Sequence, residues 1–263
     1  MNNKFLFFLL GPTCVGKTNL SLKLFNYFPL EIINIDSSMI YKFMDIGTGK
    51  PCIDVRNKFR HHLIDIKNPM DSYSVWDFCF DSFNIIIDCL NRYKIPLFVG
   101  GTMMYAWYLQ FFLKSLNEDF FLNYKLTSKI YSFYKKIKFK ISFVNIFLLP
   151  FNKNVFYCKI KDRVWNMLDC GFLNEVIFLK SEFDINLNLN FNSFKSIGYK
   201  DLLFYLNGKM NFIDAVDSII KATFRLADNQ LKWTKKFSNN SFFIENKERF
   251  FLKECVKIIN LYV

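Results

Sequence analysis

The chain has no apolar run that could cross a membrane and few of the residues that build metal sites. No apolar stretch reaches the roughly 18 residues that a membrane-spanning helix requires. The two histidines are adjacent, and the seven cysteines form no C-x-x-C pair. These absences argue against a membrane protein and against a zinc-binding module. We expect reduced thiols in a cytoplasmic protein.

The N-terminal segment lacks the features of a cleaved signal peptide. Its apolar part, Phe5–Leu10, is short and is followed by no small-residue cleavage site. It runs directly into a glycine-containing loop. We therefore expect this segment to be the first strand of the fold.

Acidic residues are scarce, with 23 Asp and Glu against 35 Lys and Arg and a formal net charge of +12. Such a surplus suits a protein that binds a polyanion such as a nucleic acid. Compositional drift explains it equally well, because the chain is also very rich in phenylalanine, with 34 residues. The chain of 263 residues is long enough for one large domain with a sizeable core.

Residues 11–18 form the most informative motif. They read Gly-Pro-Thr-Cys-Val-Gly-Lys-Thr, a full match to the phosphate-binding loop G-x-x-x-x-G-K-[ST]. The apolar run Phe5–Leu10 precedes the loop, and a helical pattern at Lys17–Tyr27 follows it. A strand before and a helix after are the context that this motif requires.

Each residue type in the loop has a physical role. Gly11 and Gly16 allow the backbone to turn successive N–H groups toward one anion. Lys17 adds positive charge at the outer phosphate, and Thr18 offers a hydroxyl to Mg²⁺. The residues predicted to bind a diphosphate or a nucleotide are Gly11, Pro12, Thr13, Cys14, Val15, Gly16, Lys17 and Thr18.

Strand and helix patterns alternate through the first hundred residues, with a long polar loop at 36–60. The expected strands are Phe5–Leu10, Glu31–Ile35, His62–Ile66 and Pro96–Val99, and the expected helices are Lys17–Tyr27, Ser74–Asn91 and one from Met103. This alternation predicts an α/β fold, a P-loop NTPase-like parallel sheet flanked by helices. Ligands in such sheets bind at the carboxyl ends of the strands.

The rest of the chain is mostly helical in pattern. We expect a P-loop core at 1–114, a short Lys-rich helical insertion at 115–140, and the remainder of the core, mostly helical, at 141–263. The elements expected in this last part are a strand at Ile141–Leu149, helices between Tyr157 and Phe237, a strand at Phe242–Ile244 and a terminal helix from about Lys247.

Polar residues follow two of the expected strands. Asp36 follows the second strand, where a carboxylate serves as a Mg²⁺ ligand, as a general base, or merely as a turn cap. Thr102 follows Gly100 and Gly101, where it either donates a hydroxyl to the site or caps the next helix. The adjacent His61 and His62 point to opposite faces of a strand, so we interpret them as structural hydrogen-bonding residues.

Taken in order, the motifs resemble those of the bacterial tRNA dimethylallyltransferases. The resemblance covers roughly residues 5–237. The matching segments are 11–18, Ile-Asn-Ile-Asp-Ser at 33–37, Met-Asp-Ile-Gly-Thr at 44–48, His-His-Leu-Ile-Asp-Ile at 61–66, Tyr-Ser-Val-x-Asp-Phe at 73–78, Gly-Gly-Thr-Met at 100–103, the segment from Arg163 to Val176, Ile-Gly-Tyr-Lys at 197–200, and the helix from Ala222 to Trp233.

The resemblance implies transfer of a dimethylallyl group from dimethylallyl diphosphate to N6 of adenine 37 in the tRNA anticodon loop, releasing diphosphate. Lys17, Thr18 and Mg²⁺ would then neutralise the leaving diphosphate. Asp36 would accept the proton of the N6 amine, and Thr102 would lie beside the reacting groups. The residues expected to face the tRNA are Asp36, Ser37, Ser38, Met39 and Thr102. We expect a monomer whose partners are the tRNA anticodon stem-loop and the donor.

Two departures from the family pattern keep other functions open. The insertion is reduced, and the two late-helix arginines of the family fall on Phe224 and Asn229. Arg225 lies one position away, about 100° around a helix, and would reach the diphosphate if that helix rotated. The alternatives are a P-loop small-molecule kinase that uses ATP, and a decayed, non-catalytic tRNA-binding relative.

Overall fold

The structure is a computed structural model that describes residues 3–117, 140–184, 191–237, 240–247 and 250–263. In this part of the chain six parallel strands form one sheet in the order β3-β2-β4-β1-β5-β6. The strands are β1 (Asn3–Leu10), β2 (Leu30–Asn34), β3 (His61–His62), β4 (Ile95–Gly100), β5 (Lys140–Leu149) and β6 (Ser241–Glu245). The expected parallel α/β sheet is therefore confirmed.

The apolar sequence of β1 reflects its central place in the sheet. It pairs with β4 on one side and β5 on the other. Leu6 and Phe8 pack into the core on one face, and Phe7 and Leu9 pack into the core on the opposite face. A strand that is buried on both faces has no polar face, so it reads as a continuous apolar run.

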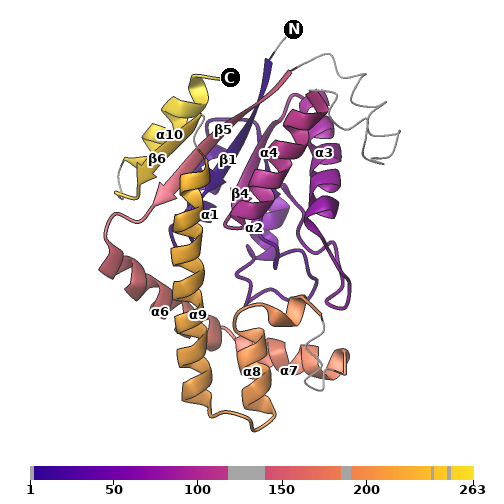
Figure 1. The fold of residues 1–263 in the computed structure, drawn as a ribbon, viewed down its shortest axis with the longest axis vertical. Helices are drawn as coiled ribbons and strands as arrows, with labels where there is room; N and C mark the ends of the chain where they lie inside the picture. Colours follow the sequence, from indigo (N-terminus) through magenta and orange to yellow (C-terminus); the bar gives the residue numbers. More distant parts are fainter. Residues whose placement is uncertain (1–2, 118–139, 185–190, 238–239, 248–249) are drawn as a thin grey trace.

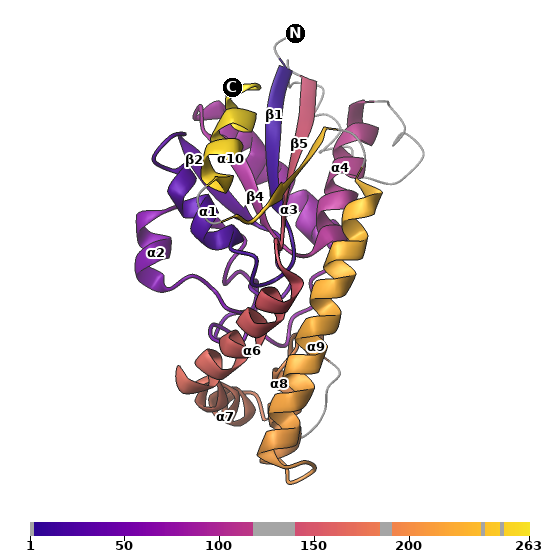
Figure 2. The ribbon, with the colours of Figure 1, turned by 90° about the vertical axis from the view of Figure 1, so that its left-hand side faces the viewer.

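Helices cover both faces of the sheet, and a helical part extends beyond its carboxyl edge (Figures 1 and 2). Their bounds are α1 (Lys17–Leu24), α2 (Ile53–Lys58), α3 (Val75–Asn91), α4 (Met103–Asn117), α6 (Lys153–Asp169), α7 (Phe172–Glu182), α8 (Tyr199–Leu206), α9 (Phe212–Trp233) and α10 (Phe251–Asn260), with short 3₁₀ turns at Ser193–Lys195 and Thr234–Lys236. Helices α3 and α4 pack together, and α1 contacts α10. The long helix α9 runs from beside the sheet to α8.

Several elements differ from the sequence prediction at their boundaries. The predicted strand His62–Ile66 is only His61–His62, because Leu63 and Asp65 adopt positive φ angles of 60° and 57°, which end an extended strand. The predicted loop 36–60 contains α2. The first helix after β5 begins at Lys153, because the Asn152 side chain accepts the backbone N–H groups of the first turn. The terminal helix begins at Phe251 rather than Lys247.

The predicted insertion at 115–140 lies largely outside the described residues. Residues 115–117 end α4, and residue 140 begins β5. The division of the chain into a core at 1–114, an insertion at 115–140 and a remainder at 141–263 stays a prediction.

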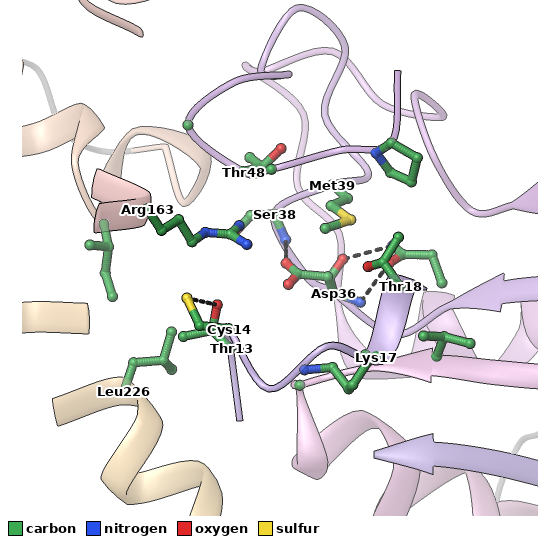
Figure 3. A pocket seen from close by; sticks show the side chains of 18 of the residues that line it. Thr13, Cys14, Lys17, Thr18, Asp36, Ser38, Met39, Thr48, Arg163 and Leu226 are labelled. Carbon is green, nitrogen blue, oxygen red and sulfur yellow. Dashed lines mark hydrogen bonds between the residues drawn. The ribbon is translucent and has the colours of Figure 1, made fainter. Parts of the chain in front are cut away.

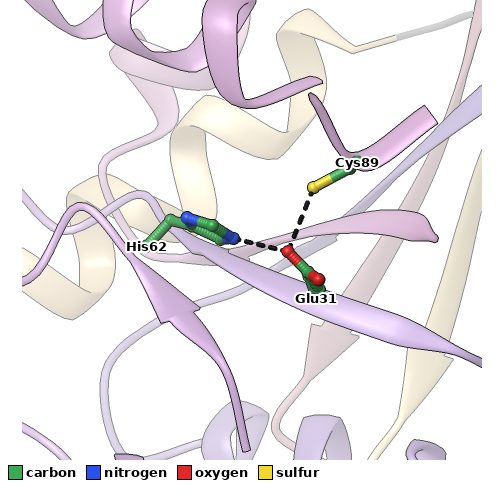
Figure 4. Close-up of side chains that lie close together, drawn as sticks. All are labelled: Glu31, His62 and Cys89. Atoms are coloured by element: carbon green, nitrogen blue, oxygen red, sulfur yellow. Dashed lines mark hydrogen bonds and ion pairs between the residues drawn. The ribbon is translucent and has the colours of Figure 1, made fainter. Parts of the chain in front are cut away.

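A buried carboxylate ties β2 to β3 and α3 (Figure 4). The Glu31 side chain is only 4% exposed, and its oxygens accept from both terminal nitrogens of Arg92, one of them at 2.8 Å. His62 Nε2 lies 2.7 Å from Glu31 Oε2, and the Cys89 thiol donates to the same oxygen at 3.4 Å. Hydrogen bonding from Arg92 lowers the pKa of Glu31 to about 2.

Glu31, His62 and Cys89 are ligand-type residues, and one ligand atom from each lies within 4.8 Å of the others. Arg92 engages both carboxylate oxygens, so the group is an ion-pair network rather than a metal centre. The other histidine, His61, pairs through Nδ1 with the Phe59 carbonyl at 2.6 Å. The expectation that both histidines are structural hydrogen-bonding residues is confirmed.

We expect Arg92→Ala to lower the free energy of unfolding by more than the loss of an exposed ion pair does, because it leaves the buried Glu31 carboxylate without its main partner. Urea denaturation at pH 7 measures this loss. The stabilisation from Glu31 is present above the unfolded pKa of about 4.5 and fades as the pH falls toward about 2, so the gap between variant and wild type should close in acid.

Arg60→Ala provides the matched control for the Arg92 variant. Arg60 faces the same carboxylate at 3.6 Å, but its side chain is 62% exposed. We expect a loss below about 1 kcal/mol, as for other exposed ion pairs. Equal losses in the two variants would contradict a special role for Arg92.

Candidate functional site

A cavity of about 420 Å³ opens at the carboxyl edge of the sheet. Loops that follow β1, β2 and β4 form its sheet side, and α6 and α9 contribute residues from the helical part (Figure 3). Of the predicted site residues, the cavity is lined by Thr13, Cys14, Gly16, Lys17, Thr18, Asp36, Ser38 and Met39. Segments far apart in sequence thus meet where an α/β sheet is expected to bind its ligand.

The phosphate loop needs glycine at two positions for different reasons. A Cβ on Gly11 would lie 2.4 Å from the backbone oxygen of Leu148, so β5 leaves no room for a side chain there. Gly16 has a φ of 97° and forms the N-cap of α1. This left-handed conformation is costly for other residues. The loop therefore turns sharply into α1, with the helix N-terminus facing the cavity.

Lys17 lies at the centre of the loop. Its Nζ donates to the carbonyl oxygens of Gly11 at 2.8 Å and Pro12 at 2.6 Å. The pKa of Lys17 is lowered to about 8, mainly by burial and to a smaller extent by the neighbouring Arg163, against the opposing effect of Asp36. The ammonium is thus held beside the phosphate-binding backbone and titrates near neutral pH.

Asp36 is fixed at the end of β2 by short-range hydrogen bonds. The buried Asn34 side chain accepts the Asp36 backbone N–H at 3.0 Å and donates to the Asp36 and Leu63 carbonyls, both at 3.0 Å. Asp36 Oδ1 accepts the Ser38 backbone N–H at 2.9 Å. The carboxylate therefore caps its turn and also lines the cavity, so the turn-cap role is compatible with either chemical role that the sequence left open, as a Mg²⁺ ligand or as a general base.

Thr102 lies behind the cavity lining. Its Oγ1 accepts the backbone N–H of Ser37 at 3.2 Å, and its own N–H donates to the Ile35 carbonyl at 3.1 Å. Thr102 therefore links the loop after β4 to the loop after β2. The predicted residues that do not line the cavity are Gly11, Pro12, Val15, Ser37, Thr102 and Arg225.

Arg163 supplies a cavity cation to which the sequence patterns gave no role. It extends from α6 toward Ser38 and Asp36 (Figure 3). A Cβ on Gly49 would lie 2.0 Å from Arg163 Nη2, so the guanidinium lies directly over this glycine. Of the described lysine and arginine side chains, Lys17 and Arg163 line the cavity. The Gly-Thr-Gly sequence at 47–49 was a signal that something packs closely there.

The structure corrects the suggested role of Arg225. The face of α9 that lines the cavity carries Ile219, Thr223, Leu226 and Gln230, whereas Arg225 is exposed and does not line it. The two positions at which the family has arginine also supply no cation in this chain. Phe224 packs against Tyr157 with ring centroids 4.7 Å apart, and Asn229 is exposed.

Gln230 joins two of the loops that carry the predicted chemistry. Its side-chain oxygen accepts the Thr13 backbone N–H at 2.9 Å, and its amide nitrogen donates to the Gly101 carbonyl at 3.0 Å. A Cβ on Gly101 would lie 2.3 Å from that nitrogen. This contact explains why the loop after β4 requires glycine at position 101.

Glu175 on α7 holds the loop that carries Gly49. Its carboxylate accepts the backbone N–H groups of Asp45 at 2.8 Å, Ile46 at 2.7 Å and Gly47 at 3.1 Å. The Tyr199 hydroxyl donates to the same carboxylate at 2.6 Å. The helical part and the sheet are thus joined at the rim of the cavity.

Comparison with known proteins agrees with these motifs. A family model described as IPP transferase matches residues 39–128 and 120–237. The chain is 34% identical to the tRNA dimethylallyltransferase of Wigglesworthia glossinidia brevipalpis, over 94% of this chain and 91% of the relative. It is 33% identical to that of Legionella pneumophila strain Paris, over 97% and 96%.

A solved structure is similar over nearly its full length. The tRNA delta(2)-isopentenylpyrophosphate transferase of Staphylococcus epidermidis superposes with a TM-score of 0.76 at 25% identity, covering 98% of both chains. Among the residues that the structure describes, no helix combines the length and apolar character needed to cross a membrane.

Proposed function

This chain belongs to the IPP transferase family, and from that premise we propose that it transfers a dimethylallyl group from dimethylallyl diphosphate to N6 of adenine 37 in the tRNA anticodon loop. The observation that carries the proposal is the convergence of Lys17, Arg163 and Asp36 on one cavity at the phosphate loop. Two cations there suit a diphosphate, and a carboxylate nearby suits proton transfer from an amine.

The phosphate loop binds the leaving group of the donor. As the allylic C–O bond breaks, its electron pair stays on the diphosphate oxygen, and the added negative charge is stabilised by Lys17, Arg163 and the N-terminus of α1. The allylic cation character of the transferred group makes departure of the diphosphate a large part of the barrier. Stabilising that departure is therefore the main task of these groups.

Asp36 serves the acceptor side of the reaction. The lone pair of the adenine N6 amine is delocalised into the ring, so the amine is a weak nucleophile until it loses a proton. As the new C–N bond forms, the proton passes to the Asp36 carboxylate. Ser38 and Met39 line the cavity together with Asp36, and we assign them and Ser37 to the tRNA-facing side.

A divalent cation fits this set of residues. The Thr18 hydroxyl and the Asp36 carboxylate both line the cavity, and both are hard oxygen donors of the kind that Mg²⁺ prefers. We propose that the Thr18 hydroxyl would hold a Mg²⁺ ion beside the bound diphosphate. The ion would supply further charge neutralisation to the leaving group.

A tRNA acceptor accounts for the excess of basic over acidic residues in the chain. A base in the anticodon loop must leave its stack to enter a cavity, and the backbone around it carries many phosphates. A net charge of +12 favours that association. The protein is proposed to act as a monomer in the cytoplasm, where tRNA is modified.

The relatives support transfer to tRNA and lend no support to a small-molecule kinase. The relatives also lend no support to a decayed, non-catalytic tRNA-binding protein. The replaced family arginines at Phe224 and Asn229 remain a departure of this chain, and Arg163 is the cavity cation that the structure offers beside Lys17.

We expect the purified protein to convert adenine 37 of a tRNA transcript to its N6-dimethylallyl form when supplied with dimethylallyl diphosphate and MgCl₂. Mass spectrometry of the digested tRNA detects the product. A transcript with guanine at position 37 is the matched control and should stay unmodified. Turnover of ATP with a nucleoside acceptor, with no modified tRNA, would favour a kinase. Binding of tRNA without any product would favour the non-catalytic alternative.

A further inference from the structure

Asn246 connects the end of the sheet to the phosphate loop. It directly follows β6, whose last residue Glu245 pairs with Leu149 of β5. The Asn246 backbone N–H donates to the Leu149 carbonyl at 2.9 Å. Its side-chain Nδ2 donates to the carbonyl of Val15, inside the phosphate loop, at 2.8 Å. Residue 246 also lies beyond the segment matched by the family model.

The bond to Val15 fixes the direction of the next N–H group. The peptide between Val15 and Gly16 is planar and trans, so its C=O and N–H point in opposite directions. Asn246 holds the C=O away from the cavity, and the Gly16 N–H therefore points toward the cavity that Gly16 lines. Within the described residues this N–H has no hydrogen-bond acceptor in the protein.

The orientation of the Asn246 side-chain amide indicates that it holds the phosphate loop and does not merely fill space. Asn246 Oδ1 is buried and has no hydrogen-bond partner in the described structure. Turning the amide over would place an oxygen against the Val15 carbonyl, so the nitrogen must face the loop. Asn246 thus leaves one buried acceptor unsatisfied while its donor holds the loop, and such an unsatisfied group calls for an explanation.

We propose that Asn246 is a positioning residue of the phosphate loop, which presents the Gly16 N–H to the diphosphate of the substrate. The peptide between Pro12 and Thr13 is also held in place by side chains, although its N–H is occupied by one of them. There Gln230 accepts the Thr13 N–H, and the Pro12 carbonyl on the far side of that peptide accepts from Lys17. This proposal rests on the proposed function, because it takes the bound anion to be the diphosphate of the dimethylallyl donor.

The test compares Asn246→Ala and Asn246→Asp with wild type. The alanine variant removes the donor, and the aspartate variant has the same shape but cannot donate to Val15. Binding of inorganic diphosphate in MgCl₂ is measured by calorimetry, and transfer kinetics are measured with dimethylallyl diphosphate and tRNA. Glu245→Ala is the matched control, because this exposed side chain forms a surface ion pair with Lys247 at 3.2 Å and makes no other ion pair with a described residue.

We expect the alanine variant to raise the Kd for diphosphate and the KM for the donor about tenfold, and the aspartate variant to raise them at least as much. The KM for tRNA and the Tm should match those of the control. A diphosphate Kd within twofold of wild type would overturn the proposal, as would a parallel loss of tRNA affinity and Tm. If wild type binds diphosphate but does not modify tRNA, the proposed function fails while the comparison of Asn246 variants still stands.

Discussion

Asp36→Asn is expected to lower kcat for dimethylallyl transfer by about 10²–10⁴-fold, the usual contribution of a positioned general base. The asparagine side chain has the same shape and still accepts the Ser38 N–H that Asp36 accepts at 2.9 Å. It cannot take the proton of the N6 amine. Single-turnover transfer with saturating donor measures the loss, and the Kd for tRNA should stay within about twofold of wild type.

Asp36→Ala separates the chemical role of the carboxylate from its structural role. The alanine variant loses both the base and the turn cap, so the difference between the two variants reports what the cap contributes. If Asp36→Asn weakens tRNA binding as strongly as turnover, then Asp36 is structural and the mechanism proposed for the N6 proton is wrong.

Lys17→Met is expected to weaken binding of inorganic diphosphate by about 10–100-fold, because it removes a charge-assisted hydrogen bond. Lys23→Met, an exposed position on the same helix, is the matched control and should bind like wild type. Calorimetry in MgCl₂ measures both. Equal affinities for the Lys17 variant and wild type would exclude Lys17 from the diphosphate site.

The effect of Lys17 should depend on pH in a definite direction. Burial lowers its pKa to about 8, so the ammonium is present below that pH and is lost as the pH rises through it. The ratio of the Kd of Lys17→Met to that of wild type should therefore be largest below pH 8 and should decline above it. A ratio that stays constant from pH 6 to pH 10 would contradict the lowered pKa.

Local sequence predicted the parts of the site that a short segment builds by itself. The phosphate loop is one, because Gly11, Gly16 and Lys17 act within eight consecutive residues between a strand and a helix. Asp36 is another, because a residue that follows a parallel strand must lie at the carboxyl edge of the sheet. The early end of β3 was not predicted, because the apolar pattern at residues 62–66 does not show the positive φ angles of Leu63 and Asp65.

The contacts that bring the site together could not be predicted in the same way. Arg163 and Gln230 reach the cavity from α6 and α9, and Asn246 reaches the phosphate loop from the turn after β6. Gln230 and Asn246 each bond to loop residues more than 200 positions away. Helical spacing could not tell which face of α9 lines the cavity, and so the sequence allowed Arg225 to reach the diphosphate if the helix rotated, whereas the face that lines the cavity carries Gln230.

The sequence alone thus determined the anion-binding loop, the parallel sheet and the family, because these follow from residues that are neighbours in the chain. The tertiary structure decided which cation joins Lys17 and which amides orient the loop. That choice depends on how α6, α9 and β6 pack against the sheet. Packing of this kind depends on shape and burial across the whole chain, and no local pattern encodes it.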